Sequence, residues 1–199
     1  MSTTSPPAAP PETRTRILET ALELFSAQGF DGTTLQQIAD RLGFTKAALY
    51  YHFRSKDDLL QAILTPALAG MNELLDAHES LPDAPAQRRR FIAEYVDYLL
   101  RHRPLIAYMV QDLAALARPE MAAASADHRK RVGAMLAGDD LDFNEQIRVA
   151  MALHGIGGVI AQYPDAATPE LREALLDATR ALLRAGRRRP QATANAVGT

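Results

Sequence analysis

Apolar residues recur at helical spacing along almost the whole chain. In the segment from Glu12 to Gln28, an apolar residue returns every three or four positions, which predicts one buried stripe on a helix. Alternating strand patterns are scarce, and the good helix formers Ala, Leu, Arg and Glu dominate the sequence. We therefore predict an all-α protein with about nine helices.

The first two predicted helices are bounded by glycines and a capping pair. Gly29 ends the first helix, as a glycine just past the last helical turn does. Thr34 followed by Gln37 matches a capping box, in which each side chain binds the backbone N–H of the other residue. The second helix then runs to Gly43 with its apolar face inward.

A third, short helix begins after Thr45, which suits an N-cap, and extends to residue 52 or 53. Ser55 followed by Asp58 predicts a second capping box at the start of a long helix over residues 56–78. Farther along, Pro104 and Pro119 each open a helix, because proline is tolerated in a first turn. The remaining predicted features are a linker at 81–85, a loop at 138–140, and helices at 143–163 and 168–186.

The pair of helices between residues 34 and 53 has the pattern of a helix-turn-helix. Two short helices that cross steeply need a small residue where they touch, and Ala39 supplies it. Gly43 tolerates the positive φ that the turn requires. Leu49 is the apolar residue that anchors the second helix. Phe53 is predicted to be buried with it, and of the adjacent Tyr50 and Tyr51 at least one must be exposed.

Two stretches of this region resemble the TetR family of transcriptional regulators. One is LYYHF at 49–53 with SKDDLL at 55–60, and the other is ILETALELF at 17–25 with GFDGTT at 29–34. The resemblance covers about residues 12–60. It implies an all-helical homodimer that represses transcription by binding a palindromic operator. The expected segments of the chain are a disordered tail (1–11), a helix-turn-helix DNA-binding domain (12–58), an effector-binding and dimerisation domain (59–186) and a second disordered tail (187–199).

The start of the third predicted helix carries groups that can read bases in the major groove. Lys46 can donate to guanine, and the methyl groups of Ala47 and Ala48 can contact thymine. Gln36 is a second candidate base reader, while tyrosine and histidine side chains can donate to phosphates. With the positions that the resemblance adds, the expected DNA contacts are Thr34, Gln36, Thr45, Lys46, Ala47, Ala48, Tyr50, Tyr51, His52 and Lys56. Lys46 or Lys56 could instead be an ordinary surface charge.

The overall charge gives this interpretation little support. The 199-residue chain has a formal net charge of −2, and residues 12–56 contain six basic and five acidic side chains, a balance of +1. Bulk charge therefore does not indicate a nucleic-acid partner. The prediction of DNA binding depends instead on where the individual charges lie. A helical ligand-binding or scaffolding protein that has lost DNA binding remains an alternative. So does an activator with the same fold.

The predicted helix at 143–163 is apolar on two faces, so it must be buried on both sides. We expect it to pair with its symmetry mate, together with the last helix, in a four-helix bundle. The expected interface residues are Ile147, Met151, Gly155, Gly158, Leu171, Leu175, Ala178 and Leu182. The alternative is a larger monomeric core.

The middle of the chain mixes apolar side chains with a few polar ones, as small-molecule pockets do. The resemblance implies an unidentified effector that lowers DNA affinity because it binds the non-DNA state more tightly. The candidate ligand residues are Tyr95, Tyr98, His102, Tyr108, Met109, Gln111, Asp112, His128 and Met135. A stripe of aromatic residues and methionine is more often part of a core.

The sequence offers little for catalysis or metal binding. There is no cysteine, and the five histidines are at least 24 residues apart, so a local metal-binding pair is excluded. The glycines at 155–158 follow no predicted strand, which argues against a dinucleotide-binding loop. We therefore predict no catalytic residues, no metal and no cofactor. Without a signal sequence or a long apolar segment, a cytoplasmic protein that does not enter the membrane is expected.

Overall fold

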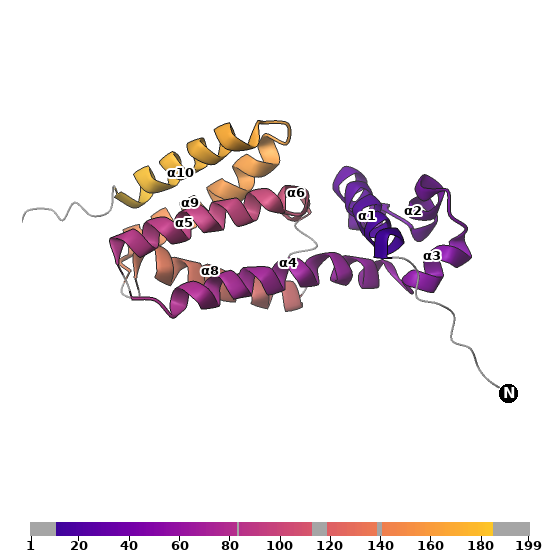
Figure 1. Ribbon diagram of the computed structural model, residues 1–199, viewed down its shortest axis with the longest axis horizontal. Coiled ribbons are helices and arrows are strands. Elements are labelled where there is room, and N and C mark those ends of the chain that lie inside the picture. Colours follow the sequence, from indigo (N-terminus) through magenta and orange to yellow (C-terminus); the bar gives the residue numbers. More distant parts are fainter. Residues whose placement is uncertain (1–10, 83, 113–118, 139–140, 185–199) are drawn as a thin grey trace, which may run out of the picture.

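The computed structural model describes residues 11–82, 84–112, 119–138 and 141–184. Every element within these ranges is an α-helix, as the sequence predicts. Three helices gather at one end of an elongated molecule (Figure 1). They are α1 (Pro11–Gly32), α2 (Leu35–Leu42) and α3 (Lys46–His52).

A long helix, α4 (Lys56–Glu79), runs from this end into a bundle that makes up the rest of the molecule (Figure 1). The other bundle helices are α5 (Pro85–Arg101), α6 (Arg103–Gln111), α8 (Pro119–Ala137), α9 (Phe143–Gln162) and α10 (Thr168–Arg184). Helix α9 packs against α5, α6, α8 and α10, and α6 also packs against α1. Helix α6 therefore belongs to the bundle and touches the N-terminal helices as well.

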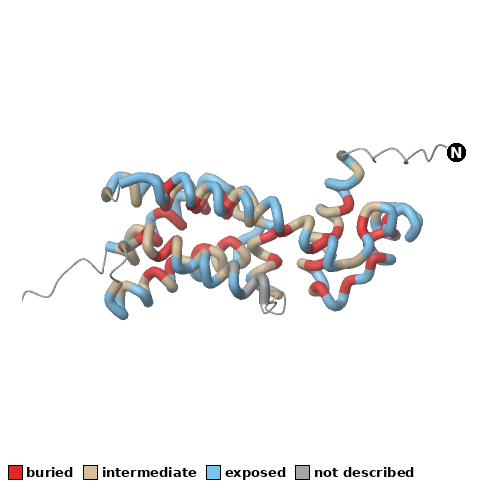
Figure 2. Tube along the Cα trace, turned by 90° about the horizontal axis from the view of Figure 1, so that it is seen from below, coloured by how far each residue is buried: buried red, intermediate tan, exposed pale blue. Residues whose placement is uncertain are grey.

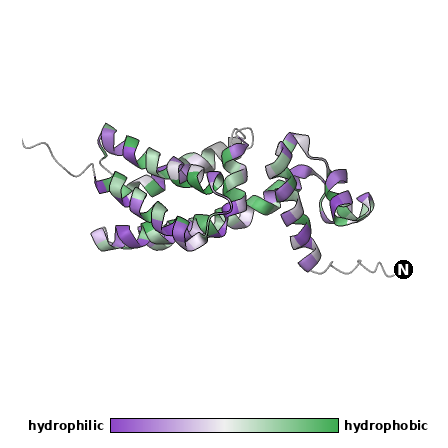
Figure 3. Ribbon diagram, turned by 90° about the horizontal axis from the view of Figure 1, so that it is seen from above, coloured by the Kyte–Doolittle hydropathy of each residue, from purple (hydrophilic) through white to green (hydrophobic). Residues whose placement is uncertain are grey.

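Buried residues form two clusters, one at each end of the molecule (Figure 2). Leu59 and Leu64 of α4 join the N-terminal cluster, whereas Leu75 of the same helix joins the bundle cluster. The predicted domain boundary after residue 58 therefore falls inside a continuous helix. Hydrophobic and hydrophilic residues form stripes along the helices (Figure 3), and no helix in the described ranges is long and apolar enough to cross a membrane.

The predicted caps of α2 and α3 are confirmed. Thr34 and Gln37 form the full capping box, with the Gln37 N–H donating to Thr34 Oγ1 at 3.2 Å and the Thr34 N–H donating to Gln37 Oε1 at 2.7 Å. Gly43 ends α2 in the left-handed region at φ 70°, as the turn requires. Thr45 caps α3 by accepting from the Ala48 N–H at 3.2 Å.

Two other boundary predictions need correction. Gly29 does take a positive φ of 77°, but the residues after it stay helical, so α1 is kinked there and continues to Gly32. Ser55 accepts from the Asp58 N–H at 3.0 Å, but the Asp58 carboxylate accepts from the N–H of Arg54 rather than that of Ser55. The predicted second capping box is therefore only half formed.

The predicted tails lie outside the described residues, except for Pro11, where α1 begins. Residues 139–140 of the predicted loop and the end of the last predicted helix at 185–186 also lie outside them. The proline signals at Pro104 and Pro119 are confirmed as first-turn positions of α6 and α8.

Candidate nucleic-acid interface and effector cavity

Helix α3 buries one face and exposes the rest. Leu49 is fully buried and Phe53, which follows the helix, is 3 % exposed, as predicted. Tyr50 and Tyr51 are 43 % and 54 % exposed, which confirms that at least one of them is exposed and shows that both are accessible. Lys46, Ala47 and Ala48 are exposed as well. The apolar anchors thus hold α3 in place and leave its polar and methyl groups facing solvent.

The exposed side chains of α3 are arranged in two pairs. The Lys46 ammonium lies 5.6 Å from the centre of the Tyr50 ring, one helical turn away, which is a favourable cation–π position. The Tyr51 ring meets the His52 ring edge-on at 5.4 Å. These contacts hold the long side chains along the outer surface of α3, which limits the entropy they lose on binding a partner.

Three of the predicted polar contacts already have partners within their own helices. Thr34 and Thr45 act as caps, and Gln36 donates to the Asp40 carboxylate at 2.6 Å. All three side chains are exposed, so they remain accessible. While one amide N–H of Gln36 is bound to Asp40, its second N–H and its amide oxygen can still contact a base.

Lys56 has a different position from the one expected for a phosphate contact or a free surface charge. Its ammonium donates to the Phe30 carbonyl at 2.7 Å and lies 4.5 Å from the centre of the Phe30 ring. Carbonyls at the end of a helix lack partners within the helix, and a lysine can satisfy them. Lys56 therefore ties the start of α4 to the last turn of α1.

Two basic residues of α1 were missed by the sequence reasoning. The Arg14 guanidinium lies 4.5 Å over the ring of Phe53, and that of Arg16 lies 5.9 Å over the ring of Phe44. Both arginines are exposed and bring positive charge beside the helix-turn-helix. No local motif marks them, because only the tertiary packing places α1 beside Phe44 and Phe53, which flank α3.

A cavity of about 230 Å³ lies between α4, α5, α6 and α8. Its wall is mainly apolar, with Leu68, Met71 and Ile106 among its lining residues. Of the candidate ligand residues, Tyr98, His102, Met109 and His128 line this cavity.

Tyr95 lies behind the cavity wall, with its hydroxyl 3.0 Å from Nε2 of His128. Burial lowers the pKa of His128, and Arg129 and Arg131 lower it further, while Asp127 opposes them. Burial and Arg101 likewise lower the pKa of His102. Both imidazoles that line the cavity are therefore neutral at pH 7.

The other candidate ligand residues lie elsewhere. Tyr108 is buried in the N-terminal cluster, 6.0 Å from the ring of Phe25, and the Asp112 carboxylate accepts from the Phe30 N–H at 3.1 Å. Gln111 is exposed and does not line the cavity, and Met135 lines a separate, smaller cavity. Tyr108 and Asp112 were misassigned because they lie, with Leu105, on the face of α6 that packs against the N-terminal helices.

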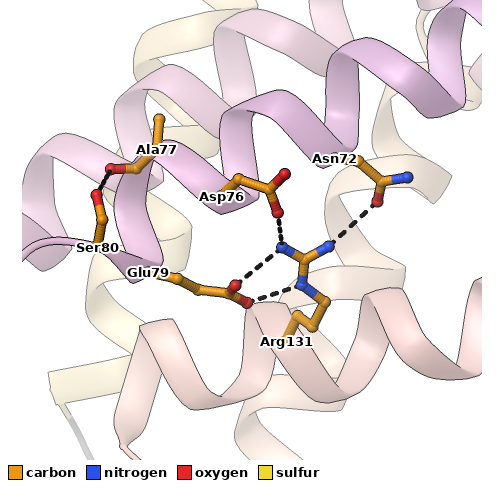
Figure 4. A network of polar contacts seen from close by, with 6 residues as sticks. All are labelled: Asn72, Asp76, Ala77, Glu79, Ser80 and Arg131. Atoms are coloured by element: carbon orange, nitrogen blue, oxygen red, sulfur yellow. Dashed lines mark hydrogen bonds and ion pairs between the residues drawn. The ribbon is translucent and has the colours of Figure 1, made fainter.

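One polar network holds a wall of the cavity in place. Arg131 of α8 donates to Asn72, Asp76 and Glu79, which follow one another along α4 (Figure 4). These contacts raise the pKa of Arg131, because each carboxylate stabilises the charged guanidinium. Asn72 also lines the cavity, so the network sets the spacing of α4 and α8 beside it.

No group of His, Asp and Glu in the described part of the chain is arranged to hold a metal.

Half of the predicted dimer surface faces solvent in the single chain. On α9, Ile147 and Met151 are 45 % and 56 % exposed and Gly155 is exposed, while Gly158 is half-buried. On α10, Ala178 is exposed and Leu182 half-buried. The assignment of Leu171 and Leu175 is corrected: both are buried in the core of their own chain, because that face of α10 packs on α5 and α9.

Comparison with known proteins gives matches to one family. The family profile described as "Bacterial regulatory proteins, tetR family" matches residues 17–63. The transcriptional regulator SrpR of Pseudomonas putida is 53 % identical over 53 residues, which are 27 % of this chain and 25 % of that protein. The negative transcriptional regulator IcaR of the biofilm operon in Staphylococcus aureus is 38 % identical over 60 residues, 30 % of this chain and 32 % of that protein. The matches thus span a quarter to a third of these relatives' length.

The structural likeness extends beyond the helix-turn-helix. The TetR-family regulator PfmR of Thermus thermophilus superposes with a TM-score of 0.67 at 27 % identity, covering 85 % of this chain and 97 % of that one. The N-terminal sequence match and the helical bundle behind it therefore lead to the same assignment. Residues 17–63 match the TetR-family DNA-binding domain, and the chain as a whole has the fold of TetR-family transcriptional regulators.

Proposed function

We propose that this protein is a transcriptional repressor that binds a palindromic operator as a homodimer and releases it when a small molecule occupies the cavity of the bundle. The observation that carries the proposal is the surface of α3, where buried Leu49 anchors a helix whose Lys46, Tyr50 and Tyr51 are exposed. Such a helix can enter the major groove while its packing stays intact. Repression rather than activation is supported by the staphylococcal relative, which is described as a negative regulator. A protein with this role works on DNA in the cytoplasm.

DNA contact is assigned to the exposed groups of the helix-turn-helix. Lys46, Ala47 and Ala48 would face base edges, whereas Tyr50, Tyr51 and His52 would bind phosphates. The exposed arginines of α1 would add phosphate contacts that the small net charge of this region conceals. Thr34, Gln36 and Thr45 would contact DNA with the hydrogen-bonding groups that their capping and intrahelical bonds leave available.

Dimerisation is supported by the exposed apolar residues of α9. Ile147 and Met151 would be buried against a second copy, with Gly155 allowing the two helices to approach. A two-fold dimer would present two α3 helices to two half-sites, which explains why a palindromic operator is expected.

Response to a small molecule is supported by the position of α6. Its residues Ile106 and Met109 line the cavity, whereas Tyr108 and Asp112 contact α1. A ligand that binds more tightly when α6 is shifted would move the DNA-binding helices and lower the affinity for the operator.

The test is binding of the full-length protein to duplex DNA from upstream of its own gene, measured by fluorescence anisotropy at several salt concentrations. Lys46→Ala is compared with Lys130→Ala, a matched loss of an exposed lysine on α8. We expect the wild type and the control to bind with nanomolar affinity. Lys46→Ala should weaken binding by roughly tenfold, which corresponds to the loss of one specific base contact.

Three outcomes contradict the proposal or a part of it. If Lys46→Ala and Lys130→Ala bind alike, α3 does not read the operator. If selection from random-sequence duplexes also yields no preferred site, the alternative holds, and the protein is a helical ligand-binding protein without DNA binding. A promoter fusion that rises in activity when the gene is expressed would indicate an activator.

A further inference from the structure

Two stacked side chains at the wall of the cavity determine which hydrogen-bonding group the cavity offers to a ligand. Tyr95 of α5 is 4 % exposed, and its hydroxyl lies 3.0 Å from Nε2 of His128 on α8. The two rings stack at 5.7 Å with an angle of 23° between them. This contact holds the imidazole in one orientation while His128 lines the cavity.

The hydroxyl of Tyr95 decides the tautomer of His128. Within the described residues, Nε2 of His128 is the one acceptor in reach of this hydroxyl, and a buried O–H without an acceptor is strongly unfavourable. Tyr95 therefore donates to Nε2. The imidazole is neutral because burial lowers the pKa of His128. Its single proton must therefore lie on Nδ1.

The Nδ1–H of His128 has no acceptor among the residues that the structure describes. The cavity wall beside it is mainly apolar, and among the described lining residues the one ionised side chain is the carboxylate of Asp127. None of these described residues is a lysine or an arginine that could compensate an anionic ligand. A carboxylate or phosphate would thus be desolvated there without a cationic partner, at high cost.

The size of the cavity restricts the ligand further. A protein cavity of roughly 150 Å³ holds benzene. The cavity of about 230 Å³ therefore suits a molecule with two fused rings or an equivalent apolar skeleton.

We propose that the effector is an uncharged apolar molecule of about two rings that carries one carbonyl-type acceptor, and that His128 binds this acceptor through Nδ1–H. The inference rests on the proposed function, because it names the ligand class of the same cavity. Tyr95 is then a positioning residue that sets the tautomer, and His128 is the residue that recognises the ligand.

The test uses three probes that share one ring system: naphthalene, 2-acetylnaphthalene and 2-naphthoate. Binding to the full-length protein is measured by equilibrium dialysis at pH 7.5 in the absence of DNA. We expect 2-acetylnaphthalene to bind about three- to tenfold more tightly than naphthalene, the ratio that one net hydrogen bond provides. Naphthoate should bind more weakly than either.

Two variants separate recognition from packing. His128→Phe keeps an aromatic ring and should abolish the advantage of 2-acetylnaphthalene while naphthalene still binds. Tyr95→Phe frees Nε2, so the proton can shift from Nδ1 and the advantage should shrink. Tyr163→Phe is the control, because it removes a hydroxyl from an exposed tyrosine that does not line the cavity. It should retain the advantage.

The inference is overturned if no probe binds, if naphthalene and 2-acetylnaphthalene bind equally, or if naphthoate binds best. It is also overturned if the advantage persists in His128→Phe. Release of operator DNA is measured separately by anisotropy. A probe that binds in the expected order but leaves the DNA bound supports the ligand class and contradicts the proposed ligand-responsive repression.

Discussion

At the scale of single residues, the contact between Tyr98 of α5 and helix α4 depends on a glycine. A Cβ at Gly70 would lie 2.9 Å from the Tyr98 hydroxyl oxygen and 3.3 Å from a carbon of its ring. That hydroxyl donates to the Ala67 carbonyl at 2.6 Å, so Tyr98 cannot move away without losing the bond. Gly70 therefore lets Tyr98 lie across α4 and line the cavity.

Gly70→Ala should lower the free energy of unfolding by about 1–3 kcal/mol, the usual cost of overpacking a buried site. Unfolding in urea, followed by circular dichroism, measures the loss. The control is Gly133→Ala, where the added methyl would meet Val149 at an ordinary 3.6 Å. The control should be neutral or more stable by up to about 1 kcal/mol, because alanine favours the helix. Equal losses in the two variants would show that crowding at Tyr98 is not the cause.

His128 should make the stability depend on pH. Its pKa is lowered in the folded protein, so below about pH 6.5 the unfolded chain binds a proton that the folded chain does not. The free energy of unfolding therefore falls as the pH drops from about 6.5 through the lowered pKa, and His102 acts in the same direction.

His128→Gln should lose less stability than the wild type between pH 7 and pH 5. Urea midpoints at the two pH values measure this difference. Glu94 and Asp97 also have lowered pKa values, but they affect both proteins alike. A wild type and variant with the same pH dependence would contradict the assignment.

At the scale of elements, α6 connects the cavity to the DNA-binding helices. Leu105 lines the cavity and also belongs to the N-terminal cluster. At the other end of α6, the Asp112 carboxylate accepts from the N–H of Phe30, just after the kink in α1. Lys56 bonds to the carbonyl of Phe30, so one residue is held by both α4 and the end of α6. A shift of α6 would thus be passed directly to the turn before α2.

Asp112→Ala should loosen the turn at Phe30. The N–H of Phe30 loses its carboxylate acceptor, so hydrogen exchange in the segment around residue 30 should become roughly tenfold faster. This factor is equivalent to about 1.4 kcal/mol, which is close to the range for a hydrogen bond to a charged group. Mass spectrometry of peptides that cover residue 30 measures the rate. Gln111→Ala, which changes an exposed neighbour, should have no effect there. Unchanged exchange in Asp112→Ala would mean that this contact does not hold α6 to α1.

At the scale of the whole molecule, one helix remains incompletely covered. Helix α9 buries Val149, Ile156 and Ile160 in the bundle, yet Ile147 and Met151 on its other side are largely exposed. A second copy of the chain would remove these side chains from water and bring two α3 helices into fixed positions.

Met151→Glu should convert the dimer to a monomer at micromolar concentration, because a carboxylate would be buried at the two-fold contact without a partner. Analytical ultracentrifugation gives the mass, and operator affinity should fall at the same time. Ala69→Glu, at an exposed position on α4, is the control and should remain dimeric. A Met151→Glu variant that remains dimeric would place the interface elsewhere.

The helix-turn-helix was predictable because its signals are local. Thr34, Gln37 and Gly43 act on backbone groups within a few residues of themselves, and the apolar anchor Leu49 follows from spacing along one helix. The dual role of α6 was not predictable in this way. Tyr108 and Met109 are adjacent in sequence, yet one lies in the N-terminal cluster and the other lines the cavity.

The sequence by itself determined the helices, the caps of α2 and α3 and the surface of α3, because backbone hydrogen bonding and helical periodicity depend on residues close together in the chain. Only the tertiary structure decided which face of each amphipathic helix meets which neighbour. It turned Leu171 and Leu175 into the core of their own chain, placed Lys56 on the Phe30 carbonyl and joined Tyr95 to His128. These pairings link residues far apart in the chain, so they depend on how several apolar faces pack together, which no single stretch of sequence specifies.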